Sequence, residues 1–120
     1  MKAGKYPRFE RDGGRLIKIG WSKKSREEYE HRASREVAQA FARALWNAME
    51  PGKTFAMEEV LPVRDSAGDE LPDYQSYLSL AWLRSEGAIE KLGRDGYVLR
   101  IQDMDTETFD TLWSHLPERP

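Results

Sequence analysis

The sequence predicts a single α+β domain, because two glycine-centred hairpin patterns flank a long helical pattern within only 120 residues. Thirteen aromatic residues and 39% hydrophobic residues are enough for a packed core, which a disordered chain would lack. A chain of this length fits one compact unit. Within it we expect three parts: a basic N-terminal hairpin over 1–24, a winged-helix-like core over 25–101, and a C-terminal helix over 105–117.

The first predicted element is a β-hairpin over 8–21. Two runs suited to strands flank Asp12-Gly13-Gly14, and glycine readily adopts the positive φ of a tight turn. After the hairpin, Ser25-Arg26-Glu27-Glu28 matches a capping box, in which serine and glutamate side chains satisfy free backbone N–H groups. The sequence therefore predicts that a helix or helical turn begins at Ser25.

The strongest periodic pattern covers 34–49. Alanine and larger apolar side chains fill more than half of the helix circumference there, which predicts packing on more than one side. The helix is expected to end at Pro51-Gly52, because a residue before proline is disfavoured in helical geometry. The polar stripe consists of Glu36, Gln39, Arg43, Asn47 and Glu50.

The remaining elements are shorter. We expect an extended piece over 53–55, a short helix over 56–61, a polar loop over 64–70 and a helix over 72–86. A second hairpin is predicted over 88–101, with a glycine turn at 93–96. Apolar residues at helical spacing then predict the C-terminal amphipathic helix: Phe109, Leu112, Trp113 and Leu116.

This order of elements over 35–101 resembles the winged helix-turn-helix superfamily. The segment 77–89 is similar to the end of a recognition helix that runs into a wing, and 93–99 looks like the wing itself. The ten-residue connection over 62–71 is longer than the usual turn of three or four residues. The resemblance implies a DNA-binding fold whose helix over 72–86 would lie in the major groove.

Charge is distributed unevenly along the chain. The formal net charge is −2 overall, but residues 1–35 carry +6, which indicates an anionic partner. Phosphate contacts are expected from the predicted wing and from the first hairpin, although an acidic protein surface would also fit. Trp21 is either a stacking platform for single-stranded nucleic acid or a core aromatic at a strand end. The candidate cations are Lys91, Arg94 and Arg100 on the wing, with Lys18, Lys23, Lys24 and Arg26 on and after the first hairpin.

The predicted helix over 72–86 has two apolar faces and therefore needs two partners. If Leu80 and Leu83 face the core, as the resemblance implies, the other face is free to bind a protein partner or a second copy. A polar stripe beside it could reach base edges. The partner-binding candidates are Tyr74, Leu78 and Trp82, and the polar candidates are Gln75 and Ser79.

Catalytic signatures are missing from the sequence. There is no cysteine, and His31 and His115 lack a metal-ligand spacing. Gly52-Lys53-Thr54 imitates the end of a P-loop without its upstream glycine. We therefore predict a protein that is not an enzyme and uses no cofactor and no metal. The sequence contains no signal peptide and no membrane span, which predicts a cytoplasmic protein.

The leading hypothesis from the sequence is a winged-helix protein that binds duplex DNA mainly through phosphate contacts, as a transcriptional regulator or accessory protein. The alternative is a protein-interaction module or homodimer on the same scaffold.

Overall fold

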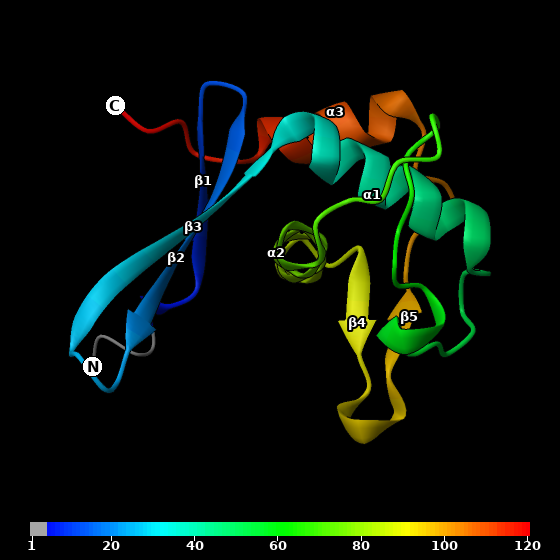
Figure 1. Cartoon of the computed structure of the whole chain (residues 1–120), viewed down its shortest axis with the longest axis horizontal. Helices are drawn as coiled ribbons and strands as arrows, with labels where there is room; N and C mark the ends of the chain where they lie inside the picture. Colours follow the sequence, from blue (N-terminus) through cyan, green and yellow to red (C-terminus); the bar gives the residue numbers. More distant parts are fainter. Residues whose placement is uncertain (1–4) are drawn as a thin grey trace.

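The N-terminal part of the chain forms a three-stranded antiparallel sheet with β2 in its centre (Figure 1). The computed structural model describes residues 5–120. The sheet contains β1 (Arg8–Asp12), β2 (Arg15–Ser22) and β3 (Glu27–Ser34). Gly13 has a φ of 61° in the turn between β1 and β2, as a tight turn requires. The first predicted hairpin is thereby confirmed.

The prediction of a helix from Ser25 is wrong, because residues 27–34 form β3. This strand pairs with β2 along its full length, from Ser22 opposite Glu27 to Arg15 opposite Ser34. Eight residue pairs along an apolar central strand outweigh a capping box, which stabilises a helix by about 1 kcal/mol. The sheet therefore continues ten residues beyond the boundary predicted at residue 24.

Three α-helices follow the sheet: α1 (Arg35–Ala48), α2 (Asp73–Ser85) and α3 (Thr106–Ser114). The hydroxyl of Ser34 caps α1 by accepting the N–H of Val37 at 3.1 Å. Asp105 caps α3 in the same way, accepting the N–H of Thr108 at 2.8 Å. These helices confirm the three long helical patterns of the sequence, with ends that differ by one to three residues.

The short elements also follow the sequence closely. A 3₁₀ turn, η2 (Met57–Glu59), lies inside the short helix predicted over 56–61. After α2, β4 (Ile89–Lys91) pairs with β5 (Tyr97–Leu99), and η3 (Gly93–Asp95) forms the turn between them. The second hairpin is therefore confirmed, and with it the α+β class.

The core is built around α2, which lies between the first sheet and the second hairpin, with α1 and α3 beside it (Figure 1). Trp82 of α2 is fully buried. Its ring meets Phe109 and Trp113 of α3 edge-on, at centroid distances of 5.6 and 5.7 Å. From α1, the buried residues are Ala38, Phe41, Ala42 and Leu45.

The C-terminal segment completes the first sheet. The N–H of Arg11 donates to the carbonyl of Pro117 at 2.9 Å, which places the segment beside β1. From there the Arg119 guanidinium crosses the outer face of the sheet to Glu10 at 3.1 Å and Glu30 at 2.7 Å. These long side chains lie on the same face as Ile17, which explains why Ile17 is buried on the side away from α2.

Candidate functional site

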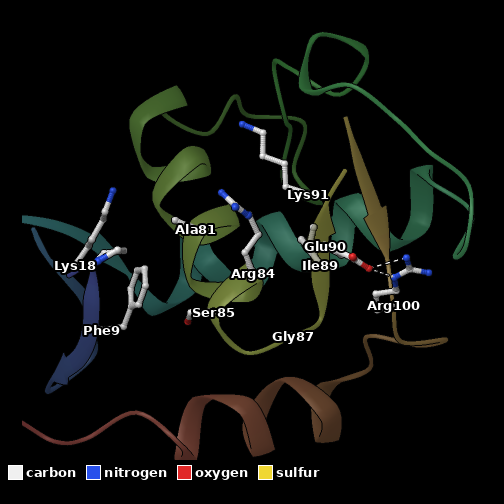
Figure 2. Close-up of a pocket in the computed structure, with 11 residues that line it drawn as sticks. Phe9, Lys18, Ala81, Arg84, Ser85, Gly87, Ile89, Glu90, Lys91 and Arg100 are labelled. Atoms are coloured by element: carbon white, nitrogen blue, oxygen red, sulfur yellow. Dashed lines mark hydrogen bonds and ion pairs between the residues drawn. The ribbon is translucent and has the colours of Figure 1, made fainter. Parts of the chain in front are cut away.

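A recess with a volume of about 640 Å³ opens between the first sheet, α2 and the second hairpin (Figure 2). Each of these three elements supplies part of its wall. The sheet and the residue before it provide Pro7, Phe9 and Lys18, α2 provides Ala81, Arg84 and Ser85, and the hairpin region provides Gly87, Ile89, Glu90, Lys91 and Arg100.

Cations dominate this recess. Lys18 comes from the middle of β2, Arg84 from the last turn of α2, and Lys91 from the end of β4 (Figure 2). Arg100 follows β5 and forms an ion pair with Glu90 at 2.6 Å. Four cations and one carboxylate leave the recess with a formal charge of +3.

Three of these cations have no carboxylate partner in the part of the chain that the structure describes. Among residues 5–120, no ion pair involves Lys18, Arg84 or Lys91. Arg84 and Lys91 instead lie near one aromatic ring, with the Arg84 Cζ 6.0 Å and the Lys91 Nζ 5.9 Å from the centroid of Tyr97. Like charges gathered without counter-charges repel one another, so a bound anion would stabilise this arrangement.

The end of α2 weakens the positive field only slightly. A helix C-terminus carries about half a negative charge, and the last turn of α2 lies in the recess wall. The carbonyl of Leu83 is already occupied by the N–H of Ala88 at 3.0 Å. A surplus of three full charges therefore remains the dominant electrostatic feature of the recess.

A second, smaller hollow of about 200 Å³ continues the recess along the sheet, and the two share Pro7 and Lys18 in their walls. Aromatic rings join the cations there. Tyr6 and Trp21 stack on each other with a centroid distance of 5.7 Å. The other lining residues are Gly20, Lys23 and Tyr29.

Tyr29 lies across the sheet from Gly20, its register partner in β2. A Cβ atom built on Gly20 would lie 2.3 Å from the Tyr29 Cζ, so the ring rests directly on the glycine. Tyr29 is nevertheless 37% exposed. The sheet therefore presents an aromatic ring to solvent beside Lys18, which lies two residues from Gly20 on the same face.

Glu28 holds Tyr6 at the edge of this hollow. The Tyr6 hydroxyl donates to the Glu28 carboxylate at 2.5 Å. This hydrogen bond is the main reason why the pKa of Tyr6 is raised above its ordinary value of 10.0. The phenol therefore stays neutral at physiological pH and fixes one wall of the aromatic hollow.

The structure divides the predicted cations into those that line one of the two hollows and those that lie outside both. Lys91 and Arg100 line the recess, and Lys23 lines the aromatic hollow. Arg94 lies farther out, in the η3 turn at the tip of the second hairpin. Lys24 and Arg26 are exposed in the turn between β2 and β3 and line neither hollow.

Three of the five residues predicted for the reading and docking face of α2 are buried, so that face is not free at Leu78, Ser79 and Trp82. Leu78 and Trp82 are buried, because α2 is enclosed by α1, α3 and the first sheet. Ser79 is also buried, and its hydroxyl donates to the carbonyl of Gln75 at 2.8 Å. The Gln75 side-chain oxygen accepts the N–H of Ser34 at 3.2 Å. Of the five, Tyr74 is 62% exposed and Gln75 is half-buried.

Sequence reasoning missed Arg84 and Tyr29. It gives Arg84 no role, and the helix that it expects from Ser25 would include Tyr29. The spacing of four and three residues places Tyr77, Ala81 and Arg84 on one helix face, which is the signal that the sequence offers for Arg84. The structure leaves none of the three fully buried. For Tyr29 the signal is its position opposite Gly20, which appears only once the strands are paired.

The structure places no three His, Asp or Glu side chains of residues 5–120 close enough together to hold a metal ion. None of the helices in that range is long and apolar enough to cross a membrane.

Comparison with known proteins finds no matching family model, no matching curated protein and no matching solved structure. What the chain binds therefore has to be inferred from the residues of the recess and of the aromatic hollow.

Proposed function

We propose that this chain is a non-catalytic nucleic-acid-binding protein that holds a phosphate backbone in the recess between the first sheet, α2 and the second hairpin. The observation that supports this most strongly is the convergence of Lys18, Arg84 and Lys91, which come from three different elements and have no ion-pair partner among the described residues. A phosphate group is the common biological anion that such a cluster binds well.

The positions of the outer cations favour a polymer over a small anion. Lys23 and Lys24 lie near the turn between β2 and β3, and Arg94 lies in η3. These turns form the outer ends of the two arms on either side of α2 (Figure 1). Phosphates that continue beyond the recess would meet them, and each neutralised phosphate would release counterions and add to affinity.

Within the winged-helix-like core, α2 would contact the backbone of the nucleic acid. The order α1, α2 and hairpin agrees with the resemblance, but α2 lies between the sheet and the hairpin and exposes only a narrow stripe. A helix that reads the major groove must protrude and present side chains to base edges. In this chain we therefore assign α2 to backbone contact through Arg84, and not to base readout.

The test is fluorescence anisotropy with a labelled mixed-sequence 20-mer, as a single strand and as a duplex, across a salt series. We expect binding that weakens linearly in log salt. Three phosphate contacts would reduce affinity about 20-fold for the strand or about 40-fold for the duplex over a fourfold rise in salt. Substituting Lys18, Arg84 and Lys91 together by Ala should remove most of this slope.

A matched control removes the same charge elsewhere. Arg15, Arg43 and Lys53 lie outside both hollows, so their joint substitution by Ala should leave the slope nearly unchanged. An equal loss in both triple variants would mean that net charge and not the recess controls binding. Absence of binding by the unsubstituted protein at low salt would remove nucleic acid as the partner.

A further inference from the structure

We propose that the bound nucleic acid is single-stranded, with one base stacked on Tyr29 while adjacent phosphates contact Lys18, Arg84 and Lys91. This inference rests on the proposed function, because it identifies which form of nucleic acid the same groove accepts. The aromatic hollow and the basic recess together form that groove, joined through Pro7 and Lys18.

The spacing on β2 supports a nucleotide that reaches from one hollow to the other. Gly20 carries the Tyr29 ring, and Lys18 lies two residues away on the same face, about 7 Å along the strand. A base on the ring therefore places its own phosphate near Lys18. The next phosphates would then pass toward Arg84 and Lys91 on the opposite walls.

The aromatic surface distinguishes a single strand from a duplex. Bases inside a duplex stack on each other, so only an unpaired base can offer its ring face to Tyr29. The cations Lys18 and Arg84 line a recess and do not form a protruding ridge. A flexible strand can enter such a recess, whereas a duplex would touch only its rim.

A purely structural role for Tyr29 is the competing explanation. Aromatic rings often cover glycines on neighbouring strands, and Tyr29 does cover Gly20. Covering the glycine requires one face of an apolar side chain, and leucine could supply it. Stacking requires the exposed face of a π system, so the two roles respond differently to substitution.

The experiment compares Tyr29→Phe with Tyr29→Leu, using the labelled single strand and its duplex at fixed salt. Tyr29→Phe should bind the strand as the unsubstituted protein does. Tyr29→Leu should bind it about 5- to 150-fold more weakly, the range expected for loss of one stacked base. The salt slope of Tyr29→Leu should equal that of the unsubstituted protein, because the phosphate contacts remain. For the same reason its affinity for duplex, which is weaker than for the strand in the unsubstituted protein, should not change.

Tyr74→Leu is the matched control, because Tyr74 is an exposed tyrosine that lines neither hollow. It should leave strand binding unchanged. A second probe needs no variant: an abasic oligonucleotide of the same length should bind the unsubstituted protein as weakly as Tyr29→Leu binds the normal strand. This comparison decides the question even if Tyr29→Leu fails to fold.

Three outcomes would overturn the inference: equal affinity for strand and duplex, equal affinity for normal and abasic strands, or a folded Tyr29→Leu variant that binds the strand normally. Each of these leaves phosphate binding in the recess intact. Failure of the proposed function looks different, because then neither strand nor duplex binds at low salt.

Discussion

Gly20 is the residue that lets an aromatic ring lie flat on the first sheet. Its φ is not positive, so the backbone does not require glycine at this position. What requires glycine is space, since a Cβ atom there would come within 2.3 Å of the Tyr29 Cζ and 2.7 Å of its Cε1. The smallest side chain in β2 thus determines where the ring of the aromatic hollow lies.

We predict that Gly20→Ala displaces the Tyr29 ring and weakens single-strand binding by a factor similar to that of Tyr29→Leu. The far end of a tyrosine can move, so the fold should persist with a small loss of stability. Anisotropy measures the affinity, and the urea midpoint measures the stability. Gly14→Ala is the control, because a Cβ atom there has no neighbour within 4 Å. Unchanged strand affinity in a folded Gly20→Ala variant would contradict the prediction.

The packing of α2 against α3 depends on Trp82. Its ring contacts Phe109 and Trp113 edge-on, a favourable arrangement for aromatic pairs. The indole Nε1 has no hydrogen-bond partner among the described residues. The contribution of Trp82 to stability should therefore come from its rings and not from its N–H group.

We predict that Trp82→Ala lowers the free energy of unfolding by about 3–5 kcal/mol, the usual cost of removing a buried large aromatic side chain. Trp82→Phe should cost much less, because it retains one ring and loses no hydrogen bond. Urea denaturation at pH 7 measures both values. Equal costs for the two variants would contradict the prediction, because they would show that one retained ring does not preserve the packing of Trp82.

The elements that the sequence predicts well are those with local signals. Gly13 marks a turn, Ser34 and Asp105 supply caps, and the apolar positions of α1 and α3 repeat at helical spacing. The strand β3 has no such signal. Its sequence from Glu27 to Arg32 is polar and charged, and it becomes a strand because β2 offers it an apolar partner with eight paired positions.

The candidate site was predictable only where one element carries it. Lys91 and Arg100 follow from the hairpin pattern of the sequence and do line the recess. Arg84 and Tyr29 belong to the site because α2 and β3 meet the hairpin and β2 in three dimensions. Leu78 and Trp82 were assigned to a free face because α3 and the third strand of the sheet, which help to enclose α2, could not be positioned from sequence.

For the whole molecule, the two ends of the described chain are joined on the outer face of the first sheet. The guanidinium of Arg119 donates to Glu10 and Glu30, and Arg8 pairs with Glu28 at 3.4 Å on the same face. The hydrogen bond from Arg119 is the main cause that lowers the pKa of Glu30 below its ordinary value of 4.5. At the cap of α3, the N–H of Thr108 lowers the pKa of Asp105 below 3.8.

These lowered pKa values predict acid destabilisation. A carboxylate whose pKa is lower in the folded than in the unfolded state stabilises the fold fully when the pH is above its unfolded-state pKa. This stabilisation is lost as the pH decreases from the unfolded-state pKa through the folded-state pKa. For Glu30 and Asp105 the loss therefore begins near pH 4.5 and 3.8 and is complete only below their folded values. Between pH 5 and pH 7 these two groups leave stability unchanged.

We predict that Glu30→Gln is less stable than the unsubstituted protein at pH 7. The gap in stability between the two proteins should close as the pH falls. Below its folded pKa, Glu30 is protonated and resembles the neutral glutamine, so the ion pair with Arg119 is absent from both proteins. Urea midpoints at pH 7, 5, 4 and 3 measure the gap. Glu27→Gln on the same strand is the control, since Glu27 has no ion pair among the described residues, and it should show little gap at any of these pH values. A gap for Glu30→Gln that stays constant from pH 7 to pH 3 would show that Arg119 does not stabilise the sheet through the charge of Glu30.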